Sequence, residues 1–385
     1  MTIRRTSDQP YAYAIDHADI FAVANRTRAV PDAYINRRGN RVTDACLDYL
    51  LPLIRGERYP IYENGLPRHM ILCCGCTGKR KAEIDYFRQE VLCFGEKGMV
   101  IKMQNQVIDR RVEEILSGMT VEDKVGQLFI VRRPQDDGVA MDALRRYRLG
   151  GFTLYACDFE NRTPESVRAL LASYREAATV APFIAADEEG GRVVRASKYP
   201  QFRALPFPAP RDLFAAGGYA AVETDTREKA AFLLDLGVNF NYAPVCDMSG
   251  NPDTFIYDRT FGNDPTATAR YVDTVVRTMN ACGLVGSIKH FPGYGDNVDT
   301  HTGIAHDDRS RETFLTRDLA PFRAGIAAGA PIVMVAHNIV SCMDPDCPAS
   351  LSPAVHSLLR EELGFEGLII TDSLDMGAIT QYTHD

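Results

Sequence analysis

The chain has 385 residues, a length that allows one large domain with an appendage or two to three smaller domains. Hydrophobic residues make up 45% and charged residues 24%, as in an average globular protein, so a collagenous, low-complexity or wholly disordered chain is excluded. The formal net charge is −8 and no block of basic residues occurs, which argues against nucleic acid as the main partner.

The N-terminal hundred residues contain short patterned pieces but no complete hydrophobic core. The first residues are polar and lack an apolar signal segment, so we expect a cytoplasmic protein. Ten cysteines are dilute in a chain this long, and we expect reduced thiols. Cys73, Cys74, Cys76 and Cys93 lack a second well-spaced pair, so residues 71–108 are predicted to be a connector without a zinc site.

From about residue 125 onward, short apolar runs alternate with helical patterns, which is typical of β-α units and a parallel sheet. The predicted strands are 126–131, 151–155, 182–186, 238–242, 285–288, 332–336 and 368–371. The predicted helices are 141–147, 164–178, 223–236, 265–282, 312–328 and 353–363, and Thr163 and Ser352 are expected to cap two of them. The uncharged stretch 324–343 is interrupted by Gly, Pro, His and Asn, so it is interpreted as a helix end and a core strand, not a membrane span.

Seven such strands fit either an open doubly wound sheet or a (β/α)8 barrel that lacks one unit. Polar residues follow the C-terminal ends of several predicted strands, namely Asp187, Asp247, Lys289, His290, His337 and Asp372. In a barrel these strand ends converge on one face, whereas an open sheet spreads them along an edge. We therefore predict an α/β fold of the TIM-like barrel type.

Two loops carry candidate ligand-binding residues. In the segment A-D-E-E-G-G-R-V-V-R, Asp187 and Arg195 offer an acceptor and a cationic donor to sugar hydroxyls, although a salt-bridged loop has the same composition. The segment D-R-T-F-G-N-D-P contains Arg259, which could clamp a ligand oxygen or pair with Asp247 or Asp258. The spacing alone does not separate these alternatives.

The segment K-H-F-P-G-Y-G-D-N-V-D-T-H is the most informative one. Lys289 and His290 are expected to point from a strand end into the site. Asp299 and His301 lie two residues apart, so the carboxylate can orient the imidazole, which titrates near pH 6.5 and can give and take a proton. A metal site formed by His290, His301 and His306 is disfavoured because the spacing matches no metal-binding loop.

The segment G-L-I-I-T-D-S-L-D-M ends an apolar strand with Asp372. A carboxylate at the mouth of the sheet could act as a nucleophile, but an Asp after a strand is also a common helix N-cap. Asp375 is predicted to begin the next helix.

Together these motifs resemble glycoside hydrolase family 3, and within it the bacterial β-N-acetylhexosaminidases. The resemblance runs from about residue 109 to 385 and rests on D-x-E-G-G-R, A-P-V-x-D, R-x-F-G, K-H-F-P-G, D-T-H and T-D-S-L-D-M in family order. Glucosidase members generally lack the K-H-F-P-G and D-x-H segment, which favours the hexosaminidase branch.

The resemblance implies a role for each matching residue. Asp372 is similar to the nucleophile, and His301 with Asp299 to the acid/base dyad. The residues similar to ligands of the terminal sugar are Asp187, Arg195, Arg259, Lys289 and His290. It implies a retaining exo-hydrolase for a carbohydrate substrate, without metal or organic cofactor; a β-glucosidase, a β-xylosidase or a catalytically silent fragment are the alternatives.

The sequence departs from the family pattern in three places. Tyr294 stands where the family usually has a second histidine. The chain ends soon after Asp372, so we expect a barrel without its eighth strand and with an open edge. Residues 23–54 resemble the C-terminal tail of a pyrophosphate-dependent type phosphofructokinase, and we expect residues 1–70 to be an extension that does not fold by itself, derived from a joined reading frame.

Overall fold

The computed structural model describes residues 110–297, 300, 303–379 and 382. The predicted extension (1–70) and connector (71–108) lie outside the described residues, and their boundaries stay predictions. The described residues from Ile115 onward form one compact unit, which contains the strands, helices and site below.

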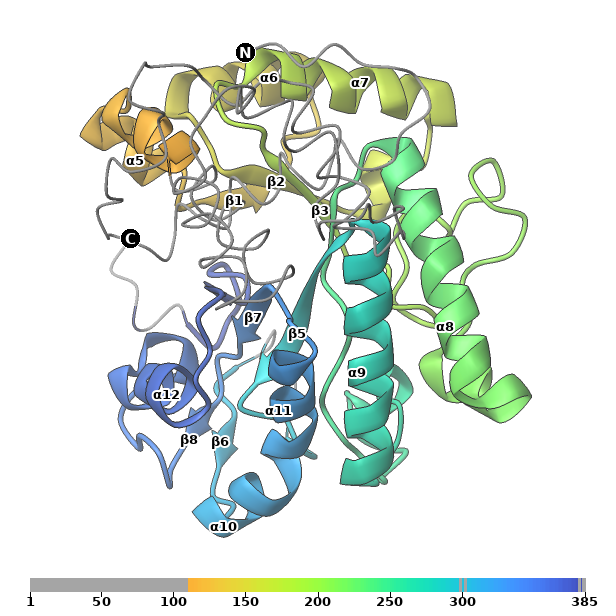
Figure 1. Cartoon of the computed structure of the whole chain (residues 1–385), viewed down its shortest axis with the longest axis vertical. Helices are drawn as coiled ribbons and strands as arrows, with labels where there is room; N and C mark the ends of the chain where they lie inside the picture. The colour runs from red at the N-terminus through yellow and green to blue at the C-terminus, as the bar shows by residue number, and fades with distance from the viewer. Residues whose placement is uncertain (1–109, 298–299, 301–302, 380–381, 383–385) are drawn as a thin grey trace, which may run out of the picture. The chain divides into compact units, whose positions relative to one another are not determined.

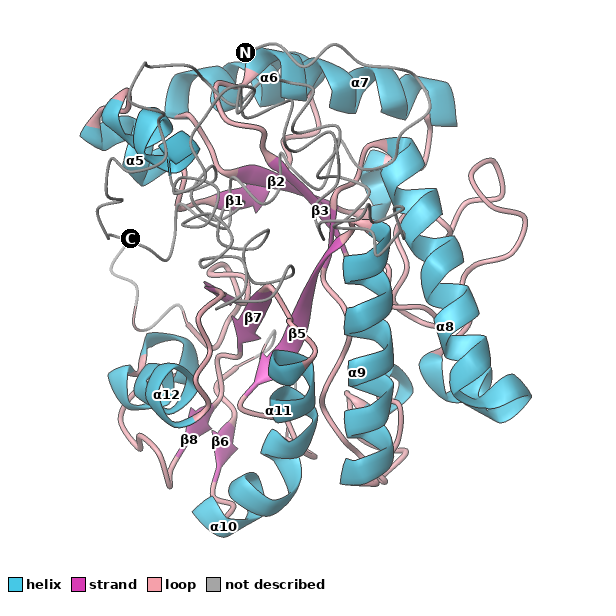
Figure 2. Cartoon of the chain, viewed as in Figure 1, coloured by secondary structure: helices cyan, strands magenta, loops and turns pink. Residues whose placement is uncertain are grey.

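The core of this unit is a sheet of seven parallel strands, each hydrogen-bonded to the next one along the chain (Figures 1 and 2). The strands are β1 (Ile130–Arg132), β2 (Gly151–Leu154), β3 (Phe183–Ala186), β4 (Phe240–Asn241), β5 (Val285–Phe291), β7 (Ile332–Val335) and β9 (Leu368–Thr371). Among the described residues no pairing joins β9 to β1. The strand order and the curled sheet confirm the predicted fold, a TIM-like (β/α) barrel.

Helices connect the strands and cover the outside of the sheet (Figure 1). They are α5 (Val121–Gly126), α6 (Asp137–Tyr147), α7 (Pro164–Ala177), α8 (Pro210–Leu236), α9 (Pro265–Cys282), α10 (Arg311–Thr313), α11 (Leu319–Ala327) and α12 (Pro353–Ser357). The hydroxyls of Thr163 and Ser352 accept hydrogen bonds from Ser166 N and Val355 N. Both predicted N-caps are therefore confirmed.

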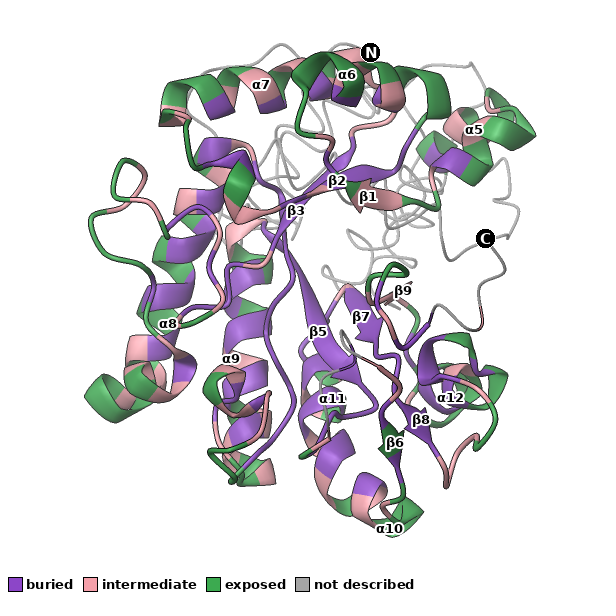
Figure 3. Cartoon of the chain, turned by 180° about the vertical axis from the view of Figure 1, so that it is seen from behind, coloured by how far each residue is buried: buried purple, intermediate pink, exposed green. Residues whose placement is uncertain are grey.

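Strands β3, β5 and β7 are buried (Figure 3), and their side chains belong to two hydrophobic clusters. Phe183, Phe240 and Tyr242 belong to one cluster with alternate residues of β5, β7 and β9. Their neighbours, such as Ile184 and Val333, join the larger cluster that packs against the helices. Each fully buried aromatic or aliphatic side chain contributes about 2 kcal/mol. The inner layer fills the base of the barrel and leaves the C-terminal strand ends for polar groups.

The first strand, predicted at 126–131, begins later than expected, because α5 occupies the chain up to Gly126 and β1 spans Ile130–Arg132. Thr120 and Asp123 form a capping box that starts this helix, and the apolar run alone did not reveal it. The helix predicted at 223–236 lies in the second part of α8, because Gly217 and Gly218 have non-helical dihedral angles that separate it from the turns that begin at Pro210. No helix in the described part of the chain is long and apolar enough to cross a membrane.

The sequence prediction also missed a second, two-stranded parallel sheet. It pairs β6 (His306–Asp307) with β8 (Ile339–Val340). Two-residue strands carry no periodic pattern, so a sequence signal for them is not expected.

Candidate active site

The predicted site residues that the structure describes follow the C-terminal ends of the strands. Asp187 comes directly after β3, Lys289 and His290 lie in the last part of β5, and Asp372 comes directly after β9. Parallel strands of a barrel end on one face, where active sites of this fold are built. The chain order of the strands therefore brings these distant residues to one end of the sheet.

Asp187 is shared by two cations. Lys289 Nζ donates to Oδ1 at 2.7 Å, and Arg195 Nη2 donates to Oδ2 at 2.9 Å. Burial opposes ionisation of the carboxyl, but Lys289 and Arg195 outweigh it, so the pKa of Asp187 lies well below its usual value. A carboxylate held in this way stays ionised and keeps accepting capacity for hydroxyl groups.

A glycine pair returns the chain so that Arg195 can reach Asp187. Gly190 and Gly191 have φ values of 108° and 63°, which other residues rarely adopt. A Cβ atom at Gly190 would lie 2.2 Å from the carbonyl oxygen of Pro208, so the site also has no room for a side chain. The turn is closed by a bridge between Gly190 and Val193.

Glu189 forms the second carboxylate of the network, and the sequence prediction did not include it. Arg259 donates to Glu189 at 3.0 Å and 2.7 Å, and Lys289 Nζ lies 2.6 Å from Oε1. Burial raises the pKa of Glu189, but Arg259 and Lys289 lower it to about 2. The predicted alternatives for Arg259, pairing with Asp247 or Asp258, were therefore both wrong, because the guanidinium pairs with a carboxylate 70 residues earlier in the chain.

His290 lies between Arg259 and Asp247. Its Nδ1 is 2.6 Å from Asp247 Oδ2, and its Nε2 is 3.2 Å from Arg259 Nη2. A guanidinium only donates and a carboxylate accepts, so Nδ1 carries the proton and Nε2 accepts. Burial raises the pKa of Asp247, yet His290 and the N–H of Tyr294 hold it below its usual value. The ring orientation of His290 is thus determined from both sides.

Asp372 is half-buried and makes only neutral hydrogen bonds among those described. Its N–H donates to Val335 O of β7 at 2.9 Å, and Ser373 N donates to its Oδ1 at 2.8 Å. Burial raises the pKa of Tyr242, and the carboxylates of Asp187 and Asp372 raise it further. Tyr242 therefore lies within electrostatic range of both carboxylates.

The prediction that Asp375 begins a helix was wrong, as was the N-cap alternative for Asp372. The described residues after β9 form turns and no helix. Asp375 is exposed and accepts a short hydrogen bond from the hydroxyl of Ser373. The loop after β9 thus presents Asp372 without burying its carboxylate under a helix.

Asp299 and His301 lie outside the described residues, but Thr300 between them is described and buried. The hydroxyl of Tyr294 donates to Thr300 Oγ1 at 2.8 Å and accepts from Thr300 N at 2.7 Å. Ala378 N donates to Thr300 O at 3.2 Å. Thr300 therefore connects the loop after β5 with the loop after β9. Across the described residues, no group of three His, Cys, Asp or Glu is placed to hold a metal ion.

Comparison with known proteins identifies the family of this chain. Residues 120–385 match the Glycosyl hydrolase family 3 N terminal domain. The chain belongs to glycosyl hydrolase family 3. It is therefore a glycoside hydrolase by family, a class of enzymes that act on O-glycosyl bonds.

Two similar bacterial proteins carry the name of a hexosaminidase. A "Beta-hexosaminidase" of Xylella fastidiosa (strain M12) is 35% identical over 250 residues, which cover 64% of this chain and 70% of that protein. The "Beta-hexosaminidase" of Xanthomonas campestris pv. campestris (strain B100) is 35% identical over 246 residues, 62% of this chain and 72% of that protein. The names and identities of these relatives support the hexosaminidase branch that the sequence predicts.

Solved family 3 structures have the same fold. A glycoside hydrolase family 3 beta-N-acetylglucosaminidase from Paenibacillus sp. str. FPU-7 superposes with a TM-score of 0.63 and 32% identity over 69% of this chain; the match spans only 51% of that chain. A Beta-N-acetylhexosaminidase from Beutenbergia cavernae DSM 12333 gives a TM-score of 0.60 and 29% identity over 69% of this chain and 82% of that chain.

The family 3 motifs contained signals for residues of the network that the sequence prediction did not assign to the site. Glu189 is the acidic position of D-x-E-G-G-R, and Asp247 ends A-P-V-x-D. Tyr242 lies next to the second motif, and its hydroxyl is 2.9 Å from Thr153 Oγ1 on β2. The motifs indicated where to look, but the pairing of Glu189 with Arg259 needed the fold.

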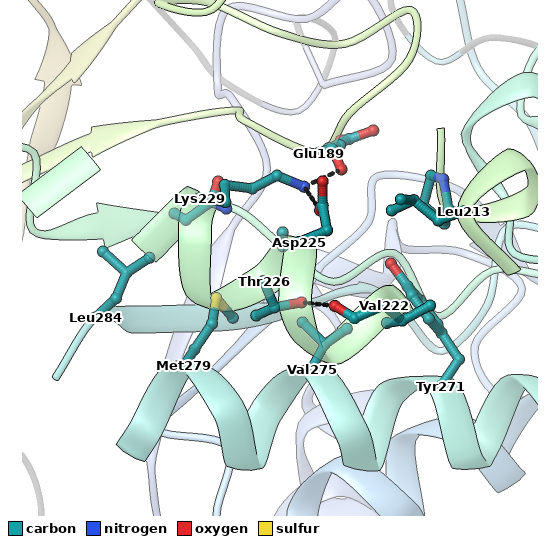
Figure 4. Close-up of a pocket in the computed structure, with 13 residues that line it drawn as sticks. Glu189, Leu213, Val222, Asp225, Thr226, Lys229, Tyr271, Val275, Met279 and Leu284 are labelled. Atoms are coloured by element: carbon teal, nitrogen blue, oxygen red, sulfur yellow. Dashed lines mark hydrogen bonds and ion pairs between the residues drawn. The ribbon is translucent and has the colours of Figure 1, made fainter. Parts of the chain in front are cut away.

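A small cavity lies behind the charged network, between α8 and α9 (Figure 4). Its wall includes Tyr271, Val275 and Met279 of α9 and Asp225 and Lys229 of α8. Lys229 Nζ pairs with Asp225 at 3.1 Å and donates to the carbonyl oxygen of Glu189 at 2.9 Å (Figure 4). The cavity belongs to the helical layer, and its polar wall supports the loop that carries Glu189.

Proposed function

We propose that the chain is a retaining exo-β-N-acetylhexosaminidase that removes terminal β-linked N-acetylglucosamine from glycans or murein fragments. The main support is the sharing of Asp187 between Lys289 and Arg195 at the strand ends. A fixed carboxylate with cationic donors beside it suits the vicinal hydroxyls of a terminal sugar. The names of the relatives support the choice of N-acetylglucosamine.

In the first step of the proposed reaction, Asp372 attacks the anomeric carbon of the terminal sugar. The bond from this carbon to the leaving oxygen breaks, and His301 gives that oxygen its proton. The product is a glycosyl ester on Asp372. Asp299 orients His301 and stabilises its protonated form in this proposal.

In the second step, neutral His301 takes a proton from water as the water oxygen attacks the anomeric carbon. The ester bond to Asp372 breaks, the carboxylate is restored and the sugar leaves with its original β configuration. A histidine base carries no negative charge and does not repel anions. Phosphate in place of water is therefore a second acceptor to test, by comparing the sugar products with and without inorganic phosphate; identical products would dismiss it.

The test of the main proposal is a comparison of three nitrophenyl β-glycosides, the N-acetylglucosaminide, the glucoside and the xyloside, on the full chain. We expect release of nitrophenol from the N-acetylglucosaminide at a kcat/KM at least about 100-fold above the other two, because a site built for polar substituents rejects analogues that lack them. Preference for the glucoside or xyloside would assign a different substrate within the family. Cleavage of none of them by a folded chain would contradict the proposal and favour a silent fragment.

A further inference from the structure

His337 occupies a special position at the end of β7. It lies two residues beyond Val335, the last residue of the strand, and its side chain is fully buried. Val335 O accepts the N–H of Asp372, so β7 already holds the backbone of the proposed nucleophile. His337 contacts Ser373, the residue that follows Asp372 in the same loop.

The ring of His337 joins two separate segments. Its Nε2 lies 2.8 Å from the carbonyl oxygen of Ser373, and its Nδ1 lies 2.7 Å from Ser350 Oγ. A carbonyl oxygen can only accept, so Nε2 must carry a proton. With a neutral ring, Nδ1 is then the acceptor and the hydroxyl of Ser350 donates to it. The carbonyl oxygen of Ser373 therefore sets the tautomer, and the hydroxyl of Ser350 holds the ring in place by donating to Nδ1.

Ser373 transmits this contact to Asp372. Its carbonyl is held by His337, and its N–H donates to Asp372 Oδ1 at 2.8 Å. The loop itself is exposed at Ser373, so solvent alone would allow several orientations of the carboxylate. Ser350 is in turn fixed by a hydrogen bond from its own N–H to Ala336 O at 2.9 Å. The chain of contacts runs from β7 through His337 to the carboxylate.

We propose that His337 is a positioning residue that fixes the carboxylate of Asp372 for attack on the anomeric carbon. This inference rests on the proposed function of Asp372 as a nucleophile. His337 touches no substrate in this arrangement, because it is fully buried. Its effect is confined to the step in which Asp372 forms a bond, and binding of the sugar by Asp187 and Lys289 is independent of it.

The experiment measures the rate of covalent labelling of Asp372 by a fluorinated N-acetylglucosaminyl fluoride, which forms a slowly hydrolysed glycosyl ester. Labelling is followed by mass spectrometry of the peptide that contains Asp372, and affinity is followed by inhibition with free N-acetylglucosamine. Three variants are compared with the unmodified chain: His337→Leu, His337→Gln and Ser350→Ala. His356→Ala is the matched control, since His356 contacts the backbone carbonyl oxygen of Ser350, at 3.0 Å, and not the hydroxyl that contacts His337.

We expect His337→Leu to slow labelling about 100-fold with affinity for the free sugar within about twofold, because a displacement of about 1 Å has an effect of this size. The Gln side chain has an N–H for Ser373 and an oxygen for Ser350, so His337→Gln should retain a rate within a few-fold of the unmodified chain. Ser350→Ala should slow labelling about 10-fold, and the control should not change it.

The positioning role would be overturned if labelling is as fast in Ser350→Ala and His337→Gln as in the unmodified chain, and folded His337→Leu also keeps that rate. A parallel loss of sugar affinity would also overturn it, because a general structural role moves both quantities. Ser350→Ala carries the test even where His337→Leu does not fold, since it removes one hydroxyl only. Absence of labelling at Asp372 in the unmodified chain would overturn the proposed function itself, and with it this inference.

Discussion

The two halves of the candidate site are held by different kinds of interaction. The binding half lies on the loops after β3 and β4 and on the last part of β5, and it consists of Asp187, Glu189, Asp247, Arg195, Arg259, Lys289 and His290. Its members are joined by charged hydrogen bonds and ion pairs of 2.6 to 3.2 Å. In the reacting half, on the loop after β9 and around Thr300, no described ion pair involves Asp372, and Asp372 and Thr300 are held by hydrogen bonds with neutral partners.

This difference matches the work that each half is proposed to do. Buried charges that are already paired need little reorganisation when a sugar replaces water, which favours a fixed binding surface. A nucleophile needs a free carboxylate, and a strong cationic partner would lower its reactivity. The reacting half can therefore be aligned by neutral groups such as His337 and Tyr294 without loss of nucleophilicity. The comparison predicts activity defects in one half and stability defects in the other.

The largest expected effect is on activity, from Asp372→Asn. An amide cannot form the glycosyl ester, so kcat should fall by about 10⁴-fold or more, as for other removed nucleophiles. The free energy of unfolding should change by less than about 0.5 kcal/mol, because the side chain is half-buried without an ionic partner among the described contacts. Steady-state assay and urea denaturation provide the two numbers.

The matched control for this prediction is Asp375→Asn, three residues along the same loop and exposed. It should keep its activity within a few-fold. Turnover by Asp372→Asn near the unmodified rate would remove Asp372 from the role of nucleophile.

In the binding half, Lys289→Met should mainly affect stability. Lys289 is 2% exposed and neutralises both Asp187 and Glu189, so its loss leaves two buried carboxylates with fewer partners. Removing one partner from a buried ion pair destabilises by about 3–5 kcal/mol. Urea denaturation at pH 7 measures this loss.

The control is Arg277→Met, which breaks an exposed ion pair with Asp273 on α9 and should change the free energy of unfolding by less than about 1 kcal/mol. Similar losses in the two variants would show that the network is not effectively buried.

The binding half also predicts acid sensitivity. The pKa of Glu189 is lowered from 4.5 to about 2 in the folded chain. A lowered pKa contributes stability that is present above the unfolded value and is lost as the pH falls through the folded value, here between about pH 5 and 2. The contribution of Glu189 is about 3 kcal/mol. Denaturant titrations across this range should give a smaller pH slope for Glu189→Gln than for the unmodified chain; an equal slope would contradict the assignment.

The sequence predicted the binding half better than the reacting half. Asp187, Arg195, Arg259, Lys289 and His290 were all predicted, and the structure connects them in one network through Glu189. Strand ends and charged motifs are local signals, so the barrel interpretation was sufficient to bring them together. The partner of Arg259 could not be predicted, because Glu189 is 70 residues away and only the register of β3, β4 and β5 makes them neighbours.

The contacts of the reacting half depend on positions without a local signal. His337 was noted as a strand-end residue, but its link to Ser373 requires the pairing of β7 with β9. Tyr294 was recognised as a departure from the family histidine, and its contact with Thr300 requires the loop geometry. The start of the first strand was misplaced for a different reason, because the capping box at Thr120 begins a helix that extends to Gly126, where the apolar run had suggested a strand.

The smallest effect is expected from Tyr294→Phe, which removes only the hydroxyl that holds Thr300. The N–H of Thr300 then loses its described acceptor in a buried place, and an unsatisfied buried donor costs about 1–2 kcal/mol. Since Asp299 and His301 flank Thr300 in the sequence, kcat should also fall, by about 10-fold, with KM nearly unchanged.

Thr300→Val removes the other hydroxyl of this contact. The double variant should lose about 1 kcal/mol less stability than the sum of the losses in the two single variants. Tyr219→Phe is the control, because this hydroxyl bonds to Ala267 O in the helical layer, at 3.1 Å. Additive losses, or a kcat that Tyr294→Phe leaves unchanged, would separate Tyr294 from the proposed acid/base loop and leave His337 as the described contact that aligns the reacting half.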